Sequence, residues 1–143
     1  MPFEYIDDIA IADVAFRAVG QTVEEMFIAA AEATMGAMVE RLEAIEPREA
    51  RQIALSSPAL DMLLFNLLQE IIFFKDAEQL LLRIESLTIT SDEAQYGAKA
   101  SARGEQIDSG RHETIVDVKA VTLHRFTVEQ TARGWECFVI LDI

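Results

Sequence analysis

The spacing of the apolar residues changes along this chain, from a helical period in its first part to alternation in its second. Val23, Met26 and Phe27 recur at the three- and four-residue spacing of an amphipathic helix. From Ser86 onward apolar and polar residues alternate, as they do in a half-buried strand. Helices early and strands late are typical of the α+β class. We expect a single two-layer domain, with a mixed or antiparallel sheet and two main helices on it.

Two stretches predict these helices. Thr22, followed three residues later by a glutamate, can begin the first helix as in a capping box, and this helix should run to about Leu42. Ser57 and Pro58 suit the cap and the first position of the second helix. Polar residues are sparse from 59 to 74, so we expect the second helix to be the more buried of the two.

The expected strands lie mostly in the second part of the chain. Residues 137–141 are apolar at every position, so their strand should lie inside the sheet with both faces covered. This strand follows a turn at residues 131–134 and should form a hairpin with the strand before it. The expected strands are residues 13–19, 51–55, 86–90, 94–103, 114–124, 126–130 and 135–142.

Length and charge limit the classes of function. The 143 residues suit one domain, residues 1–143, and 51% of them are hydrophobic, which suits a folded core. The 25 acidic residues against 12 Lys and Arg give a net charge of −13, so the surface repels phosphate backbones and anionic membranes. The single cysteine, Cys137, can form no internal disulfide, and we see no signal peptide or membrane span. We expect a cytoplasmic protein that binds neither nucleic acid directly nor membranes.

Common catalytic and cofactor motifs are absent from the sequence. It has no Walker loop, no GxGxxG, CxxC or HExxH pattern and no nucleophile elbow. His112 and His124 fall in or beside one predicted strand, where they would lie about 40 Å apart at 3.3 Å per residue. We therefore expect them to make ordinary hydrogen bonds rather than to share a metal.

Carboxylates remain as candidate site residues. Asp142 ends the last strand, and the carboxylate of Ile143 follows it, while Asp13 begins a strand that we expect beside it. Carboxylates gathered at one end of a sheet repel one another unless a cation is bound. Oxygen ligands favour a hard ion such as Mg²⁺ or Ca²⁺. The competing interpretation is that these acids are solvated strand edges or turn caps.

Motifs along nearly the whole chain resemble those of the archease family. Residues 117–124, DVKAVTLH, are similar to the family's EVKAVTYH signature, with Leu123 in place of tyrosine. The ending, residues 134–143, resembles the family's C-terminus, an apolar strand that closes on Asp-Ile. Weaker matches are residues 12–16 with Gly20, residues 22–27 and residues 63–70.

The N-terminal motif departs from the family. Archeases usually read DHTAD before the first strand, whereas residues 9–13 here read IAIAD. The histidine and the first aspartate are missing, and Asp7 or Asp8 would replace that aspartate only with a shift of register. The last aspartate of the motif, Asp13, is kept.

The resemblance implies an accessory protein rather than an enzyme. It implies that the chain activates an RNA ligase of the RtcB type in tRNA splicing or RNA repair. Such ligases use GTP and a metal to join a 2′,3′-cyclic phosphate or 3′-phosphate end to a 5′-hydroxyl. Archeases promote guanylylation of the ligase histidine and allow multiple turnover. A net charge of −13 suits a basic partner of this kind.

The resemblance also implies a set of site residues. The family's divalent-metal site, for Mg²⁺, Ca²⁺ or Mn²⁺, maps onto Asp13 and Asp142, with the main chain or terminal carboxylate at Ile143. Lys119 and His124 are candidate contacts to the partner or to a phosphate. We expect the acidic end of the sheet to dock near the nucleotide pocket of the ligase, where its carboxylates help to place the metal.

Three other functions are compatible with the sequence. The chief alternative is a chaperone-like or general interaction module, in which Asp13 and Asp142 are only structural. Another is a metal-dependent phosphodiesterase or phosphatase, although the sequence offers few bases or nucleophiles besides carboxylates. The third is a divergent family member that binds the ligase but activates it poorly.

Overall fold

The structure, a computed structural model, describes residues 2–7 and 13–143. Asp8, a candidate ligand only in a shifted register, lies outside the described residues, as do residues 9–12. Along the chain the elements are β1 (Phe3–Ile6), β2 (Asp13–Gly20), α1 (Val23–Met38), the 3-10 helix η1 (Leu42–Ala44), β3 (Glu49–Ser57), α2 (Leu60–Glu78), β4 (Leu80–Ser91), β5 (Tyr96–Gln106), β6 (Ala120–Thr131) and β7 (Gly134–Asp142).

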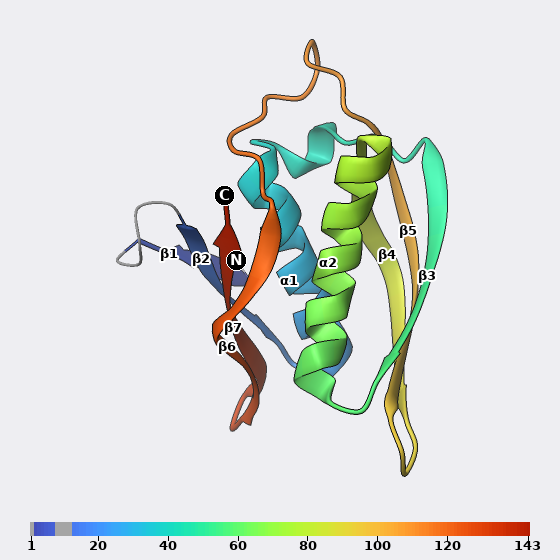
Figure 1. The fold of residues 1–143 in the computed structure, drawn as a ribbon, viewed down its shortest axis with the longest axis vertical. Coiled ribbons are helices and arrows are strands. Elements are labelled where there is room, and N and C mark those ends of the chain that lie inside the picture. The colour runs from blue at the N-terminus through green and yellow to red at the C-terminus, as the bar shows by residue number, and fades with distance from the viewer. Residues whose placement is uncertain (1, 8–12) are drawn as a thin grey trace.

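The strands form two sheets, and the two long helices lie between them (Figure 1). One sheet has the order β1-β2-β7-β6 and the other the order β3-β5-β4. Each pairing between these strands is antiparallel. Helix α1 packs against β2 and β7 on one side and β4 on the other, while α2 packs against β6 and against all three strands of the second sheet.

The α+β class with two main helices, expected from the sequence, is confirmed. The structure refines the arrangement, because the strands divide between two sheets instead of forming one. Strand β3 connects the two helices and pairs with β5, so the middle of the chain builds its own sheet. Strand β7 lies between β2 and β6, as its apolar sequence predicts. The strand β1 was not predicted.

Helix α1, not α2, is the more buried helix, so that expectation was wrong. Both sheets cover α1, and its many alanines allow close packing on both sides. Helix α2 is apolar around most of its circumference but still exposes Phe73 to solvent. The buried residues of α1 are Met26, Phe27, Ala29, Ala30, Ala31, Ala33, Thr34, Met35, Ala37 and Met38. Neither helix is long and apolar enough to cross a membrane, within the part of the chain that the structure describes.

The helix boundaries agree with the sequence at one cap and differ elsewhere. The Thr22 side chain caps α1 by accepting a hydrogen bond from the backbone N–H of Glu25 at 3.1 Å, as predicted. Helix α1 ends at Met38 rather than near Leu42, because Val39 turns to extended backbone and bridges to Thr114. The prediction that Ser57 caps α2 was wrong. Ser57 is the last residue of β3, and the helix cap is at Ala59.

The strand expected at residues 114–124 was also predicted too long. Thr114 makes only an isolated bridge with Val39, and regular pairing starts at Ala120. A bulge then interrupts β6 between Thr122 and Thr127. The hairpin of β6 and β7 is confirmed, with Gly134 at a φ of 138° after the turn.

Candidate functional site

Asp13 and Asp142 are directly opposite each other at one end of the four-stranded sheet. Asp13 is the first residue of β2 and Asp142 the last of β7, and the register of the two strands pairs them. Opposed residues of an antiparallel pair point to the same face, with Cβ atoms about 4.5–5.5 Å apart. The structure therefore places two carboxylates side by side, an arrangement of like charges that destabilises a sheet unless a cation balances it.

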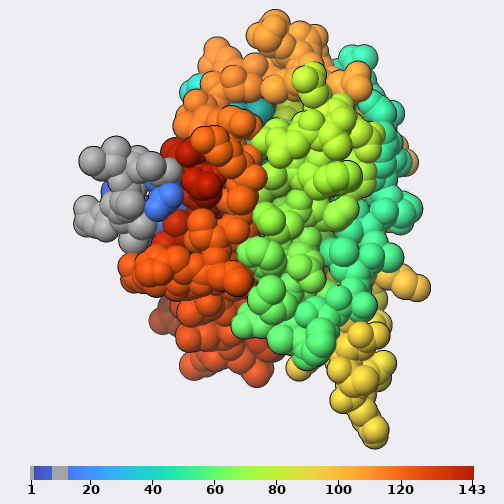
Figure 2. Space-filling view, viewed as in Figure 1, coloured from blue at the N-terminus to red at the C-terminus, as the bar shows by residue number. Residues whose placement is uncertain are grey.

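The backbone of Asp142 is held on both sides, and its side chain is exposed. On its other side Asp142 is paired with Ala120 of β6. The Asp142 carbonyl accepts a hydrogen bond from the backbone N–H of Lys119 at 2.8 Å. Ile143 is half-buried and packs against the core, which positions the main chain after Asp142. Figure 2 shows these C-terminal residues, in dark red, beside the orange segment that leads into β6.

The same end of the molecule receives the C-terminal turns of both helices. Gly36 and Ala37, in the last turn of α1, line a cavity of about 300 Å³ together with Asp7 and Asp13. In the last turn of α2, Lys75 forms an ion pair with Asp117, which precedes β6. Helix C-termini carry partial negative charge. We call Asp7, Asp13, Asp117 and Asp142 the acidic end of the molecule.

The donor atoms at the acidic end are carboxylate and backbone oxygens. Carboxylate and backbone oxygens suit Mg²⁺, Ca²⁺ and Mn²⁺. Within residues 2–7 and 13–143, no three His, Cys, Asp or Glu side chains come together as a complete metal site. Mg²⁺ is often held by only one or two carboxylates, and substrate phosphates and water complete its coordination. Asp13 and Asp142 therefore fit a partial site, in which two carboxylates hold the ion and phosphates or water complete its coordination.

The two remaining candidate residues lie along β6 and just before it. Lys119 is exposed and immediately precedes β6, with its backbone bonded to Asp142. His124 is exposed in the β6 bulge, four residues after Ala120, so it lies up to about 13 Å further along the strand. The structure thus brings Lys119, but not His124, to the Asp13–Asp142 pair.

Lys75 is a residue of this end that the sequence did not single out. Its ammonium group donates hydrogen bonds to Asp117 at 2.5 Å and to the carbonyl of Val118 at 2.8 Å, and it also pairs with Asp76. Burial lowers the pKa of Lys75, but the hydrogen bonds to Asp117 and Asp76 outweigh this and raise it overall. The sequence around Lys75 does not indicate this role, because its partner Asp117 is 42 residues away along the chain.

A second buried charge cluster holds the loop after β5. Glu105 is buried and accepts hydrogen bonds from Arg111, from His112 at 3.2 Å and from the backbone N–H of Glu46 at 2.5 Å. Burial opposes ionisation of Glu105, but these hydrogen bonds outweigh it and lower its pKa to about 2. Nδ1 of His112 accepts from the backbone N–H of Asp108 at 2.9 Å. The expectation of ordinary hydrogen bonds therefore holds for His112, and the cluster is structural.

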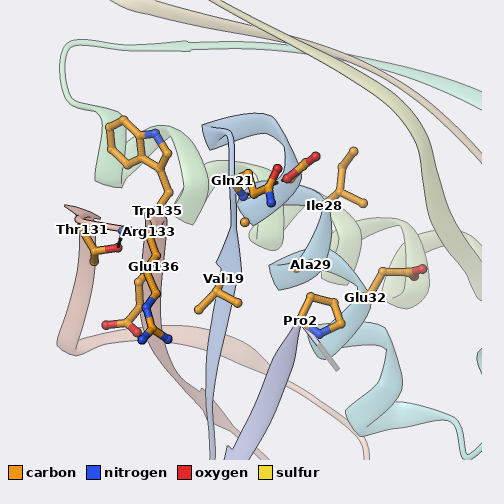
Figure 3. A pocket seen from close by; sticks show the side chains of 12 residues that line it. Pro2, Val19, Gln21, Ile28, Ala29, Glu32, Thr131, Arg133, Trp135 and Glu136 are labelled. Carbon is orange, nitrogen blue, oxygen red and sulfur yellow. Dashed lines mark hydrogen bonds between the residues drawn. The ribbon is translucent and has the colours of Figure 1, made fainter.

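A larger cavity, of about 890 Å³, lies at the opposite end of the four-stranded sheet (Figure 3). Gly20 and Trp135, which are paired where β2 ends and β7 begins, both line it. Side chains from β2, from the first half of α1 and from the β6–β7 turn surround it, among them Val19, Ile28 and Arg133. Most of its lining is apolar, and it is open to solvent.

Comparison with other proteins shows similarity to archeases along nearly the whole chain. The model of the Archease protein family matches residues 3–143. A protein archease of Methanosarcina mazei is 32% identical over 142 residues, which cover 99% of this chain and 95% of the relative. A protein archease of Pyrococcus abyssi is 34% identical over 133 residues, covering 92% of this chain and 93% of the relative.

Solved structures give the same result. The solution structure of Methanobacterium thermoautotrophicum protein 1598 matches with a TM-score of 0.85 and 31% identity, covering 99% of both chains. A crystal structure from Thermotoga maritima, described as an archease and possible chaperone, matches with a TM-score of 0.65, covering 96% of this chain and 97% of the other. Its identity is 16%, so this second likeness shows the fold alone.

Proposed function

This chain belongs to the archease family, and from that premise we propose that it is an accessory protein that activates an RNA ligase of the RtcB type. In this proposal it promotes the metal-dependent guanylylation of the ligase by GTP, and so sustains multiple turnover in tRNA splicing or RNA repair. It carries out no reaction of its own and acts in the cytoplasm.

The observation that carries the proposal is the pairing of Asp13 with Asp142 at the end of two adjacent strands. Together with a main-chain oxygen of Ile143, these carboxylates would hold a divalent ion and leave coordination positions for phosphate oxygens. A divalent ion bound there would supply positive charge against the phosphates of GTP. Asp13 and Asp142 would orient that charge, and the packing of Ile143 against the core keeps the end of β7 fixed.

Electrostatics supports a protein partner rather than RNA. The chain has a net charge of −13, and the acidic end adds two helix C-termini to its four carboxylates. A basic ligase would be attracted to such a surface, whereas a phosphate backbone would be repelled. In this proposal Lys119, whose backbone N–H bonds to the Asp142 carbonyl, would contact a phosphate of GTP, and His124 would contact the partner from the β6 bulge.

A second candidate function is a chaperone-like interaction module. The apolar cavity of about 890 Å³ at the opposite end of the sheet favours it, because open apolar cavities can receive partner side chains. The Thermotoga maritima protein, which shares the fold, is described as a possible chaperone. In that case activity would survive loss of Asp13 and Asp142 and would show no preference for the ligase.

A multiple-turnover RNA ligation assay tests the proposal. The RtcB-type ligase of the same organism is supplied at limiting concentration with GTP and Mg²⁺ or Mn²⁺, and the protein is added as wild type, Asp13→Asn or Asp142→Asn. We expect wild type to increase the number of turnovers per ligase and both variants to lose most of that increase.

Glu129→Gln is the matched control, because it removes one exposed carboxylate from the same sheet, where Glu129 is paired with Glu136 away from Asp142. This control should act as wild type. Equal acceleration by all variants would keep the partner and reject the carboxylate site. No acceleration by wild type would reject the ligase.

A further inference from the structure

Ile115 is an exposed aliphatic side chain on a fixed backbone. It is 57% exposed, in the segment that connects β5 to β6 across the end of the helices (Figure 1). Its backbone N–H donates to the Met38 carbonyl at 2.8 Å, and the backbone N–H of Glu40 donates to the Glu113 carbonyl at 2.8 Å. Four residues further on, the N–H of Lys119 bonds to Asp142. Ile115 is therefore held outward by backbone contacts on both sides.

Ile115 lies between two small apolar cavities. One, of about 270 Å³, is lined by Met38, Leu81 and Ile107. The other, of about 300 Å³, is the one that Asp7 and Asp13 line, and Tyr5 also borders it. Ile115 and Val116 line both cavities. The exposed apolar side chains Tyr5, Ile107 and Ile115 thus gather on one surface, whereas single exposed apolar residues are scattered on most proteins.

The border of this apolar surface is acidic. Asp117 lines the first cavity, and Asp7 and Asp13 line the second. The charge of Lys75, the cation in the first cavity, is balanced by Asp117 and Asp76. An apolar centre with a charged border is the usual composition of a protein–protein interface.

The charges decide which occupant fits. An anionic membrane or a nucleic acid would be repelled by the acidic border. A second copy of this chain would bring one acidic end against another. A protein surface with apolar side chains among Lys and Arg residues matches both the apolar centre and the border.

We infer that Ile115, with the two cavities beside it, is the apolar contact by which this protein binds its ligase, a role that rests on the proposed function. Asp13 lines one of the cavities and is opposite Asp142, so a partner bound over Ile115 lies next to both carboxylates. The surface thereby sets the approach of the basic partner to the acidic end.

Binding of the ligase to Ile115→Asn and Ile115→Val tests this inference. Both substitutions are at an exposed position, and circular dichroism and thermal unfolding confirm that the variants fold. By titration calorimetry we expect the Kd of Ile115→Asn to rise by about tenfold or more, the effect of losing one buried aliphatic side chain. Ile115→Val should stay near wild type, and affinity for Mg²⁺ or Mn²⁺ alone should be unchanged in both.

Val19→Asn is the control, because Val19 is 42% exposed and lines the cavity at the opposite end of the sheet. It should bind the ligase as wild type does. The inference would be overturned if Ile115→Asn bound the ligase as tightly as wild type, or if Val19→Asn lost as much affinity as Ile115→Asn. In either case the proposed function would still stand if wild type accelerated ligation. A wild type that neither binds nor accelerates the ligase would overturn both. The inference would also be overturned if wild type formed a dimer and Ile115→Asn were a monomer that still bound the ligase normally. That result would assign the surface to a second copy of the chain.

Discussion

Glu105 is a carboxylate removed from water whose partners keep it ionised. It accepts hydrogen bonds from Arg111 and His112, which tie the end of β5 to the loop that follows it. It also accepts one from the backbone N–H of Glu46, which ties β5 to the loop before β3. Because the pKa of Glu105 falls to about 2 on folding, its ionised form stabilises the folded state. The contribution is complete above the ordinary pKa of 4.5 and is lost as the pH falls toward 2.

Glu105→Gln should therefore destabilise the protein at neutral pH and much less in acid. We expect a loss of roughly 1.5–3 kcal/mol in the free energy of unfolding at pH 7, the range for hydrogen bonds to a charged group. The difference from wild type should shrink between about pH 4.5 and pH 2. Urea denaturation at several pH values measures this, with Glu129→Gln as control. A difference that stays constant with pH would contradict the account.

At the scale of the element, polar side chains of α2 hold β6 and the segment before it. The Gln69 side-chain oxygen accepts from the backbone N–H of Val121 at 2.9 Å. Lys75 donates to Asp117 and to the Val118 carbonyl. These contacts hold Asp117 and Val118 in place. The next residue, Lys119, donates its backbone N–H to the Asp142 carbonyl.

Lys75→Met should loosen this segment without unfolding the molecule. Methionine can fill the apolar space of the lysine stem but makes none of its hydrogen bonds. Amide hydrogen exchange of Lys119 should become about five- to tenfold faster, which corresponds to the loss of roughly one net hydrogen bond. Lys99→Met, at an exposed position of β5, should leave that exchange rate unchanged. An unchanged rate in Lys75→Met would show that α2 does not secure the segment.

The turn between β6 and β7 requires glycine at position 134. Gly134 has a φ of 138°, and a Cβ there would lie 2.3 Å from the carbonyl oxygen of Gly20. Gly134→Ala should lower the free energy of unfolding by about 1–3 kcal/mol through backbone strain. Gly110→Ala, in a loop where the nearest atom would be an Asp108 side-chain oxygen at 3.3 Å, should cost less. Equal thermal stabilities of the two variants would argue against this reason for the glycine.

Local features of these elements could be predicted, and features set by remote pairing could not. The cap at Thr22 and the turn at residues 131–134 depend on neighbouring residues, and both are where the sequence indicates. Ser57 has the sequence of a cap, yet β3 continues through it because it pairs with Tyr96 of β5. The division into two sheets depends in the same way on which strands meet.

The candidate site shows the same limit. Asp13 and Asp142 could be expected at one end of a sheet because each lies at the end of its predicted strand. The pairing of Lys75 with Asp117, and the hydrogen bond from the backbone N–H of Glu46 to Glu105, join segments that are remote in the sequence and meet only in the fold. The strand expected to start at residue 114 begins only at Ala120, because the chain before it crosses between the sheets with a single isolated bridge, from Thr114 to Val39.

At the scale of the whole molecule, the two ends of the helical layer differ in character. The acidic end combines paired carboxylates, two helix C-termini and the exposed Ile115. The opposite end of the four-stranded sheet carries the apolar cavity of about 890 Å³. A net charge of −13 surrounds both ends, so long-range attraction to a basic partner acts on the molecule as a whole.

Association with the ligase should therefore depend on ionic strength. The Debye length falls from about 10 Å at 0.1 M to about 3 Å at 1 M, which screens attraction between the two proteins. We expect the association rate constant to fall by about tenfold or more between 0.05 and 0.5 M NaCl, while the dissociation rate constant changes less. Stopped-flow or surface-plasmon measurements give both constants. An association rate that does not depend on salt would contradict electrostatic attraction.

The most direct test of the central claim is transfer of labelled GMP from GTP to the ligase, measured in a single turnover against Mg²⁺ or Mn²⁺ concentration. If Asp13 and Asp142 help to hold the ion at the GTP phosphates, wild type should lower the metal concentration needed for guanylylation. Asp142→Asn should require about 10- to 100-fold more metal, the size of effect produced even by removing groups that support metal ligands. Glu129→Gln should behave as wild type. An Asp142→Asn variant that binds the ligase and promotes guanylylation at the same metal concentration as wild type would contradict the claim.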